Sequence, residues 1–100
     1  MTQYQLLVCI VNAGFSQNVM EAARAAGARG GTIIRGRGSA NPEAEEFFNI
    51  SIQPDKEVVL ILVTNEMKDT VMTAVFKNSG LSTDGQGIAF SLPVERTTFD

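Results

Sequence analysis

Glycine and arginine residues cluster in one short segment of this chain, residues 30–39. Two glycines precede four residues of strand character, after which Arg35 and Arg37 alternate with Gly36 and Gly38. Glycine lets a backbone approach a ligand closely, and arginine offers charge-assisted hydrogen bonds to an anion. The segment therefore predicts an anion-binding corner after a strand, made of Thr32, Arg35, Gly36, Arg37, Gly38 and Ser39.

A second glycine group, Gly85-Gln86-Gly87, lies near the C-terminal end of the sequence. Successive backbone N–H groups in such a loop can point at one anion, so we expect all three residues to contribute to the same site. Neither glycine group has the sequence order of a P-loop or of a dinucleotide-binding turn. Gly-x-Gly also occurs in ordinary tight turns. The two arginines could instead be solvated, or could pair with Glu43, Glu45 and Glu46.

The composition excludes several kinds of chemistry. The chain has no histidine and a single cysteine, Cys9, which rules out Ser-His-Asp and Cys-His catalytic sites and the usual zinc sites. The carboxylates show no spacing that marks an acid–base pair, although those of the loop could hold a hard cation. A net charge of −3 argues against nucleic-acid binding. We therefore expect a binding protein that is not an enzyme and has no dedicated metal site.

The length and hydropathy predict one folded domain over residues 1–100. Apolar residues make up 44% of the chain, enough for a core of this size. The longest apolar runs, residues 6–11 and 58–63, are far shorter than the roughly 20 residues of a membrane span. The N-terminal residues lack the basic start of a signal peptide, and the lone cysteine fits a reducing cytoplasm. We therefore expect a cytoplasmic protein without membrane insertion.

Two helices are expected between the strands. Ser16 is the predicted N-cap of a helix over residues 17–26, which ends at Gly27. Thr64 or Asn65 is predicted to cap a second helix that extends to about residue 78. The apolar positions of both helices have helical spacing. They are Val19, Met20, Ala22, Ala23 and Ala26 in the first helix, and Met67, Val71, Met72, Val75 and Phe76 in the second.

The strands and helices follow one another in the order βαββαβ. The two continuous apolar runs predict central strands, and shorter strands are expected at residues 32–35 and at residues 88–92, where Pro93 would end the last one. An alternating stretch at residues 48–52 indicates a half-buried strand that a turn at residues 53–56 follows. This order is typical of an α+β ferredoxin-like fold, with a four-stranded antiparallel sheet and two helices on one face.

The central strands are apolar on both faces, which has a consequence for assembly. Two helices cover one face of such a sheet, and large exposed apolar surfaces are uncommon on soluble monomers. We therefore expect other copies of the chain, or another protein, to cover the second face.

Three segments resemble the PII signalling family, and especially its PII-like branch. They are residues 30–38, residues 57–63 and residues 85–95, the last of which reads GQGIAFSLPVE. The family consists of trimeric cytoplasmic sensors of nitrogen and carbon status that regulate nitrogen utilization. The resemblance extends over nearly the whole chain. It implies a ferredoxin-like subunit, a homotrimer, and adenine-nucleotide sites in the clefts between subunits.

The resemblance also assigns individual residues. Thr32, Gly36 and Gly38 would line one side of a bound ATP, ADP or AMP, and Gly85 and Gly87 would line its phosphate side. The mobile T-loop of the family, which contacts target proteins such as enzymes or transporters, corresponds here to residues 39–47.

The chain departs from the family pattern at several positions. Gln86 and Ile88 replace an aspartate and a lysine of the family, which removes a phosphate-binding cation. Ser39 and Ala40 replace an Arg-Gln pair whose glutamine helps to bind magnesium and 2-oxoglutarate, so 2-oxoglutarate sensing is not expected. The loop also lacks the tyrosine that is usually uridylylated.

We therefore expect a trimeric regulator that binds an adenine nucleotide or a small anion between subunits and controls a partner protein through residues 39–47. An alternative, favoured by the missing cation, is a structural or protein-interaction trimer that has lost ligand binding. A third possibility is the metal-tolerance family with the same βαββαβ trimer. The absence of histidine and the single Cys9 argue against that third class, because soft metals prefer sulfur and imidazole ligands.

Overall fold

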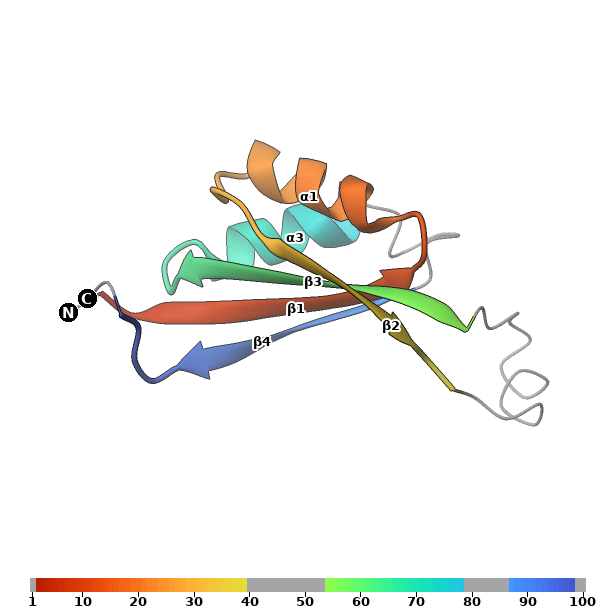
Figure 1. Ribbon diagram of the computed structural model, residues 1–100. Helices are drawn as coiled ribbons and strands as arrows, with labels where there is room; N and C mark the ends of the chain where they lie inside the picture. Colours follow the sequence, from red (N-terminus) through yellow and green to blue (C-terminus); the bar gives the residue numbers. More distant parts are fainter. Residues whose placement is uncertain (1, 40–53, 79–86, 99–100) are drawn as a thin grey trace.

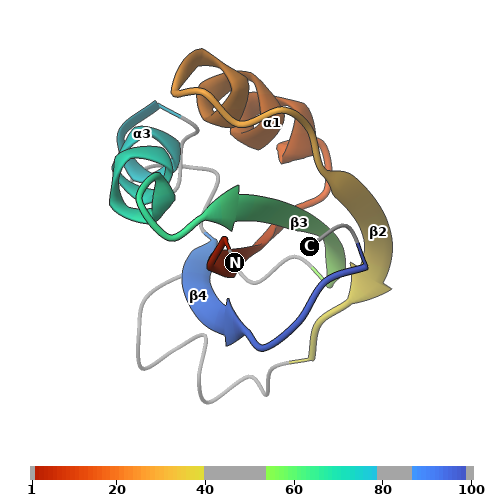
Figure 2. The ribbon, with the colours of Figure 1, turned by 90° about the vertical axis from the view of Figure 1, so that its left-hand side faces the viewer.

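The computed structural model describes residues 2–39, 54–78 and 87–98. Within these ranges the element order is β1 (Tyr4–Asn12), α1 (Ser16–Ala25), β2 (Thr32–Arg37), β3 (Asp55–Thr64), α3 (Lys68–Asn78) and β4 (Ile88–Val94). The strands form one antiparallel sheet in the order β2-β3-β1-β4. Both helices cover the same face of this sheet, as Figures 1 and 2 show. The predicted ferredoxin-like fold is confirmed, whereas the strand expected at residues 48–52 lies outside the described residues.

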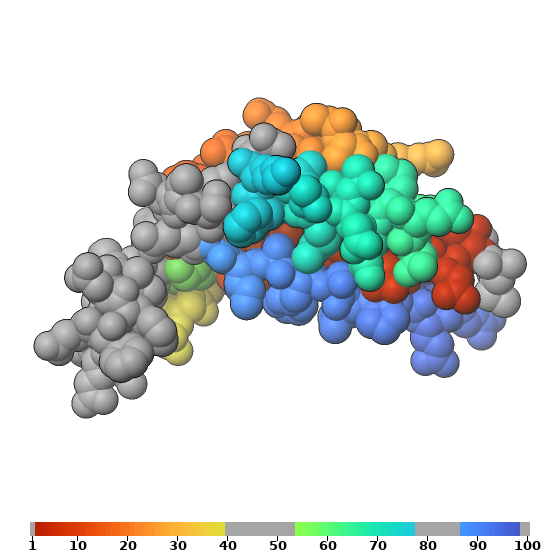
Figure 3. Space-filling view, turned by 180° about the vertical axis from the view of Figure 1, so that it is seen from behind, coloured from red at the N-terminus to blue at the C-terminus, as the bar shows by residue number. Residues whose placement is uncertain are grey.

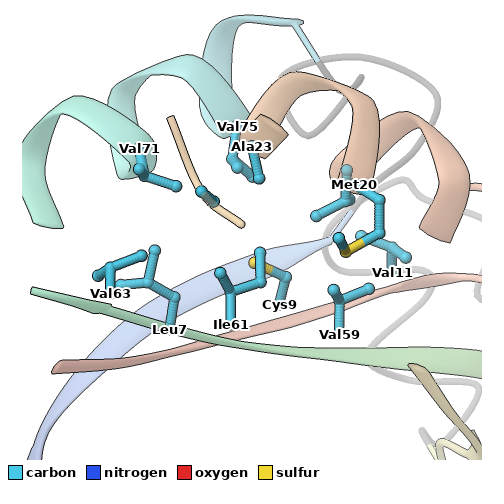
Figure 4. Close-up of a cluster of buried hydrophobic side chains, with 12 residues drawn as sticks. Leu7, Cys9, Val11, Met20, Ala23, Val59, Ile61, Val63, Val71 and Val75 are labelled. Atoms are coloured by element: carbon cyan, nitrogen blue, oxygen red, sulfur yellow. The ribbon is translucent and has the colours of Figure 1, made fainter. Parts of the chain in front are cut away.

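The core lies between the sheet and the two helices (Figure 4). Alternation along β1 and β3 turns every second residue toward the helices, where Leu7, Cys9 and Ile61 have no exposed surface. From α1 and α3, the core receives Val19, Met20, Ala23, Val71 and Val75. Small side chains on α1 let this helix lie close to its neighbours. Burial raises the pKa of the Cys9 thiol to about 11, so this residue is a small buried hydrophobe as expected.

The C-terminal end of α1 follows its sequence signal closely. Gly27 adopts a φ of 110°, in the region that favours glycine, and its N–H donates to the carbonyl of Arg24. The N–H of Ala28 donates to the carbonyl of Ala23, which completes a Schellman motif. The chain then turns back toward the sheet with Ala28 buried in the core.

Several element boundaries differ from the prediction for identifiable reasons. The Ser16 prediction is wrong: the N-cap position of α1 is Phe15, which makes no side-chain capping bond. Pro93 does not end β4, because β4 is an edge strand that pairs with β1 alone and can accept a proline. Residues 65–67 form a turn before α3 begins. Phe76 is 56% exposed, and in the described part of the chain β4 is the edge strand on its side of the sheet.

The face of the sheet opposite α1 and α3 is apolar over most of its area. We call it the open face; Figure 2 shows it beneath the curved sheet. The strand registers place Val8 at its centre, with Leu60 of β3 opposite on one side and Phe90 of β4 on the other. Its remaining apolar side chains include Leu6, Ile10, Ile34, Val58, Leu62, Ile88 and Leu92. Five of these positions are conspicuously exposed: Ile34 at 47%, Leu62 at 37%, Ile88 at 57%, Phe90 at 38% and Leu92 at 48%.

Candidate functional site

The residues of the predicted anion-binding corner belong to β2 and lie on both of its faces. Gly36 and Arg37 are paired within the strand, opposite Lys56 and Asp55, and do not form a turn after it. Neither Gly36 nor Gly38 has a positive φ. Alternation places Thr32, Gly36 and Gly38 on the open face, and Arg35 and Arg37 on the helix side. Ser39 follows the strand and is exposed. The two arginines and the glycines therefore do not converge on one point within a single chain.

Arg35 and Arg37 each stand opposite an acidic residue of β3. The register pairs Arg35 with Glu57 and Arg37 with Asp55. Cross-strand pairs of opposite charge stabilise a sheet modestly. Both arginines therefore stand across the sheet from strand carboxylates, and the charge of Arg35 contributes to lowering the pKa of Glu57.

Glu57 holds the N-terminus of α1 from the neighbouring sheet. Its Oε1 accepts hydrogen bonds from the N–H of Gly14 at 2.7 Å and from the N–H of Ser16 at 3.3 Å. The Gly14 bond is the largest cause that lowers the pKa of Glu57, and the Ser16 contacts and the charge of Arg35 add to it. Glu57 thus supplies the capping group that the helix itself lacks.

Lys56 is the cation that shares the open face with the glycines of β2. It stands opposite Gly36, and its side chain runs beside Gly38, where an added Cβ would lie 3.1 Å from the lysine Cε. Its Nζ donates a hydrogen bond to Oδ1 of Asn12, a buried side chain at the end of β1. Because the two glycines have no side chains, an anion could approach the lysine ammonium closely at this point.

Gly87 lies at the same end of the sheet as Gly36 and Gly38, but at the opposite edge. It immediately precedes β4, whereas the other two glycines belong to or follow β2. Three strand spacings, about 14 Å along the sheet, separate the two edges. Gly85 and Gln86 lie outside the described residues. Figure 3 shows β4 from behind, running beneath α3.

A pocket of about 750 Å³ lies at the other end of the sheet, where β1 begins and β3 ends. We call it the edge pocket. β2 pairs with β3 only as far as Leu60, and β3 continues to Thr64, so the last residues of β3 form one of its walls. The segment from Gly27 to Thr32 forms the opposite wall. Its volume falls in the range of small-molecule sites.

The wall formed by β3 offers backbone hydrogen bonds to a ligand. The carbonyl of Leu60 points toward the β2 side, because an added Cβ at Gly31 would lie 2.9 Å from its oxygen. Alternation gives Leu62, two residues later, the same direction for its N–H and C=O. Leu62 lines the edge pocket, where no strand in the described part of the chain continues β2 beside it. One donor and one acceptor in an apolar slot can bind the edge of a planar heteroaromatic ring.

Sequence reasoning placed Thr32 in a site but missed the edge pocket, Lys56 and Glu57. The pocket joins three segments that are distant in sequence, so no local motif could reveal it. Lys56 was expected in a turn. Its position opposite Gly36 was accessible only through the strand register.

The described residues contain no group of three or more His, Cys, Asp or Glu side chains that could hold a metal ion. Within the same ranges no helix is long and apolar enough to cross a membrane.

Comparison with known proteins shows the fold family. No protein-family model matches the chain, and no curated protein has a similar sequence. Among solved structures, the chain is similar to PII of Arabidopsis thaliana bound to citrate, with a TM-score of 0.69 and 22% identity over 94% of this chain and 77% of that one. It is also similar to a Bacillus cereus protein related to NIF3, with a TM-score of 0.73 and 13% identity over 95% of this chain.

The match to the NIF3-related protein covers 26% of that longer chain. This chain therefore has a PII-like ferredoxin fold. The same fold also occurs as one part of a larger protein.

Proposed function

We propose that this protein is a PII-like regulator. In this proposal it binds an adenine nucleotide, or a small anion, in clefts between subunits of a homotrimer. Ligand binding favours one arrangement of residues 39–47, most of which lie outside the described residues, and so changes the affinity for a target protein. The regulator is cytoplasmic and has no catalytic activity of its own.

The observation that carries this proposal is the edge pocket at the end of β3. It combines apolar walls from Leu6 and Leu60 with the hydroxyl of Thr32 and the backbone groups of Leu62. Adenine presents a ring nitrogen acceptor beside an amino donor, which matches the donor and acceptor of one strand residue. The similar PII structure holds citrate, which supports the small-anion form of the proposal.

The position of the pocket relative to the glycines favours a site shared between copies. The edge pocket lies where β3 ends, whereas Gly36, Gly38 and Lys56 lie where β3 begins. Along β3, six residues or roughly 20 Å separate Lys56 from Leu62. In a ring of copies, the edge pocket of one subunit would hold the base, and the glycines and Lys56 of its neighbour would face the phosphates. Arg35, Arg37, Ser39 and residues 85–87 would border that phosphate end.

The open face supports the homotrimer. The side chains at its centre are apolar, and five large ones are more than a third exposed in a single chain. Burying apolar surface stabilises an assembly by about 25 cal/mol per Å². Closing three curved sheets around a common axis would remove this face from water.

Calorimetric titration with ATP, ADP, AMP and citrate tests the ligand, and sedimentation tests the trimer. We expect saturable binding of at least one adenine nucleotide at one site per chain. Gly30→Leu places a large side chain at the pocket wall, where an added Cβ meets no atom within 4 Å, and should abolish binding without unfolding the protein. The control variant must introduce a leucine at an exposed position away from the pocket. Gly14 is unsuitable because its φ is positive, so Asn18→Leu on the exposed side of α1 is used. The absence of heat and of any thermal shift at millimolar ligand would overturn the nucleotide proposal.

A structural or interaction trimer without a ligand is the second candidate. The division of Arg35 and Gly36 between two faces of β2 favours it, because these residues cannot cradle one anion together. Under this reading Gly30→Leu and Arg37→Ala leave partner binding unchanged. A partner interaction that requires nucleotide would exclude this reading.

A further inference from the structure

Arg29 is the residue whose placement the proposed function leaves unexplained. It lines the edge pocket from the segment between α1 and β2, with its side chain exposed. The backbone on either side of it is fixed. Ala28 is buried in the core, and Gly31 packs so closely on Leu60 and Met20 that an added Cβ would lie 2.9 Å from atoms of both. Arg29 is therefore held at the wall of the pocket by packing on both sides.

Among the described residues, the charge of Arg29 has no ion-pair partner within 4 Å, since the ion pair found there joins Lys68 to Asp69. Arg29 is also the one charged residue among the described residues that line the edge pocket. An unpaired guanidinium beside an apolar slot can donate several hydrogen bonds to a phosphate or carboxylate.

The neighbouring glycines show that space beside Arg29 is kept free. Gly31 is required by packing, whereas an added Cβ at Gly30 would meet nothing within 4 Å. Gly30 also has no positive φ, so its conformation does not require glycine. A glycine that is required neither by packing nor by a positive φ often marks a place where a ligand or another backbone approaches closely.

We propose that Arg29 recognises the anionic group of a ligand whose ring occupies the edge pocket. It thereby makes the site select nucleoside phosphates over nucleosides. This inference rests on the proposed nucleotide function and adds the cation that the last loop lacks, from a position on the base-binding half of the site. Arg29 acts here as a specificity residue, and the glycines and Lys56 of a neighbouring copy contact the outer phosphates.

Titration of adenosine and AMP into the wild-type protein and Arg29→Ala tests this role. We expect the wild-type protein to bind AMP about tenfold or more tightly than adenosine, as a charge-assisted hydrogen bond to phosphate would produce. Arg29→Ala should lose this preference while its affinity for adenosine stays unchanged. Arg29→Lys should retain part of the preference, because it keeps the charge but not the planar fork.

Arg24→Ala is the matched control, since Arg24 is equally charged and exposed on the last turn of α1 but does not line the pocket. It should keep the full AMP preference. The AMP affinity of the wild-type protein should also fall with salt more steeply than that of Arg29→Ala. An unchanged AMP preference in Arg29→Ala would overturn this inference and leave the nucleotide function standing. Failure of the wild-type protein to bind adenosine, AMP, ADP or ATP would overturn both.

Discussion

The two faces of the sheet are built from alternate residues of the same strands. The main difference between them is that α1 and α3 cover one face and not the other. On β3, Ile61 is fully buried under the helices, whereas its neighbour Leu62 is 37% exposed on the open face. Leu7 and Leu6 of β1 show the same contrast between a buried and a partly exposed side chain. A sheet in which only one face is covered by its own chain usually alternates apolar and polar residues. The lack of alternation here is the observation behind the proposal that association buries the second face.

Phe90→Glu should have the largest effect on the difference between the two faces, because it places a charge on the open face. Phe90 stands beside Val8 at the centre of the open face, and a carboxylate there could not be buried without a large desolvation cost. We expect complete loss of self-association while the fold remains, measured by sedimentation velocity and circular dichroism. Thr70→Glu, on the exposed surface of α3, adds the same charge and should leave the assembly intact. A wild-type protein that sediments as a monomer would contradict the argument.

Ile61→Ala and Leu62→Ala compare the two faces of the sheet at adjacent residues of β3. Removing the buried side chain of Ile61 should lower the free energy of unfolding by about 3 kcal/mol, because a cavity remains in the core. The same truncation at Leu62 should cost about 1 kcal/mol or less in the dissociated chain, since this side chain is already partly in water. Urea denaturation in the Phe90→Glu background separates folding from association. Equal losses at the two positions would show that the open face is covered within one chain.

Gly31→Ala and Gly30→Ala compare a packed glycine with a free one in the wall of the edge pocket. The Cβ of Gly31→Ala would lie 2.9 Å from the carbonyl oxygen of Leu60, so we expect a loss of about 2 kcal/mol. Gly30→Ala meets no atom and should be neutral or stabilise the chain by up to about 1 kcal/mol, by restricting the unfolded state. Thermal unfolding measures both. A destabilised Gly30→Ala would mean that Gly30 is needed for folding and not for a ligand.

Glu57→Gln should have the smallest effect and a distinctive pH dependence. The folded-state pKa of Glu57 lies below its ordinary value of 4.5, so its carboxylate stabilises the fold above that pH. The stabilisation is lost as the pH falls through the lowered folded-state pKa. We expect Glu57→Gln to be less stable than the wild type by about 1 kcal/mol at neutral pH, with the difference shrinking as the pH falls below 4.5. Glu66→Gln, on the exposed turn before α3, is the control and should leave the stability at neutral pH unchanged.

The sequence predicted the fold well because the strands carry strong signals. Continuous apolar runs located β1 and β3, and Gly27 located the end of α1. The candidate site was predicted less well, because it depends on strand register. Whether Arg35 and Gly36 share a face follows from pairing with β3, and no motif in their own segment contains that information.

Helical periodicity likewise grouped Phe76 with the apolar positions of the second helix. It could not show that Phe76 would be 56% exposed, because the extent of the sheet beneath the helix is not written in the helix sequence. The cap of α1 was misplaced for a similar reason, since its hydrogen-bond acceptor comes from Glu57 on another element, more than forty residues away.

The pairing of β2 with β3 is closed at its outer end by the bond from the N–H of Gly38 to the carbonyl of Pro54, at 2.7 Å. This bond joins the two strands directly on either side of the connecting segment. Doubling the length of such an insert costs only about 0.6 kcal/mol in closure entropy, and the strand register does not change. The segment between them can therefore diverge in length and sequence during evolution while the scaffold is preserved, and new partners could be acquired at this position without redesign of the core.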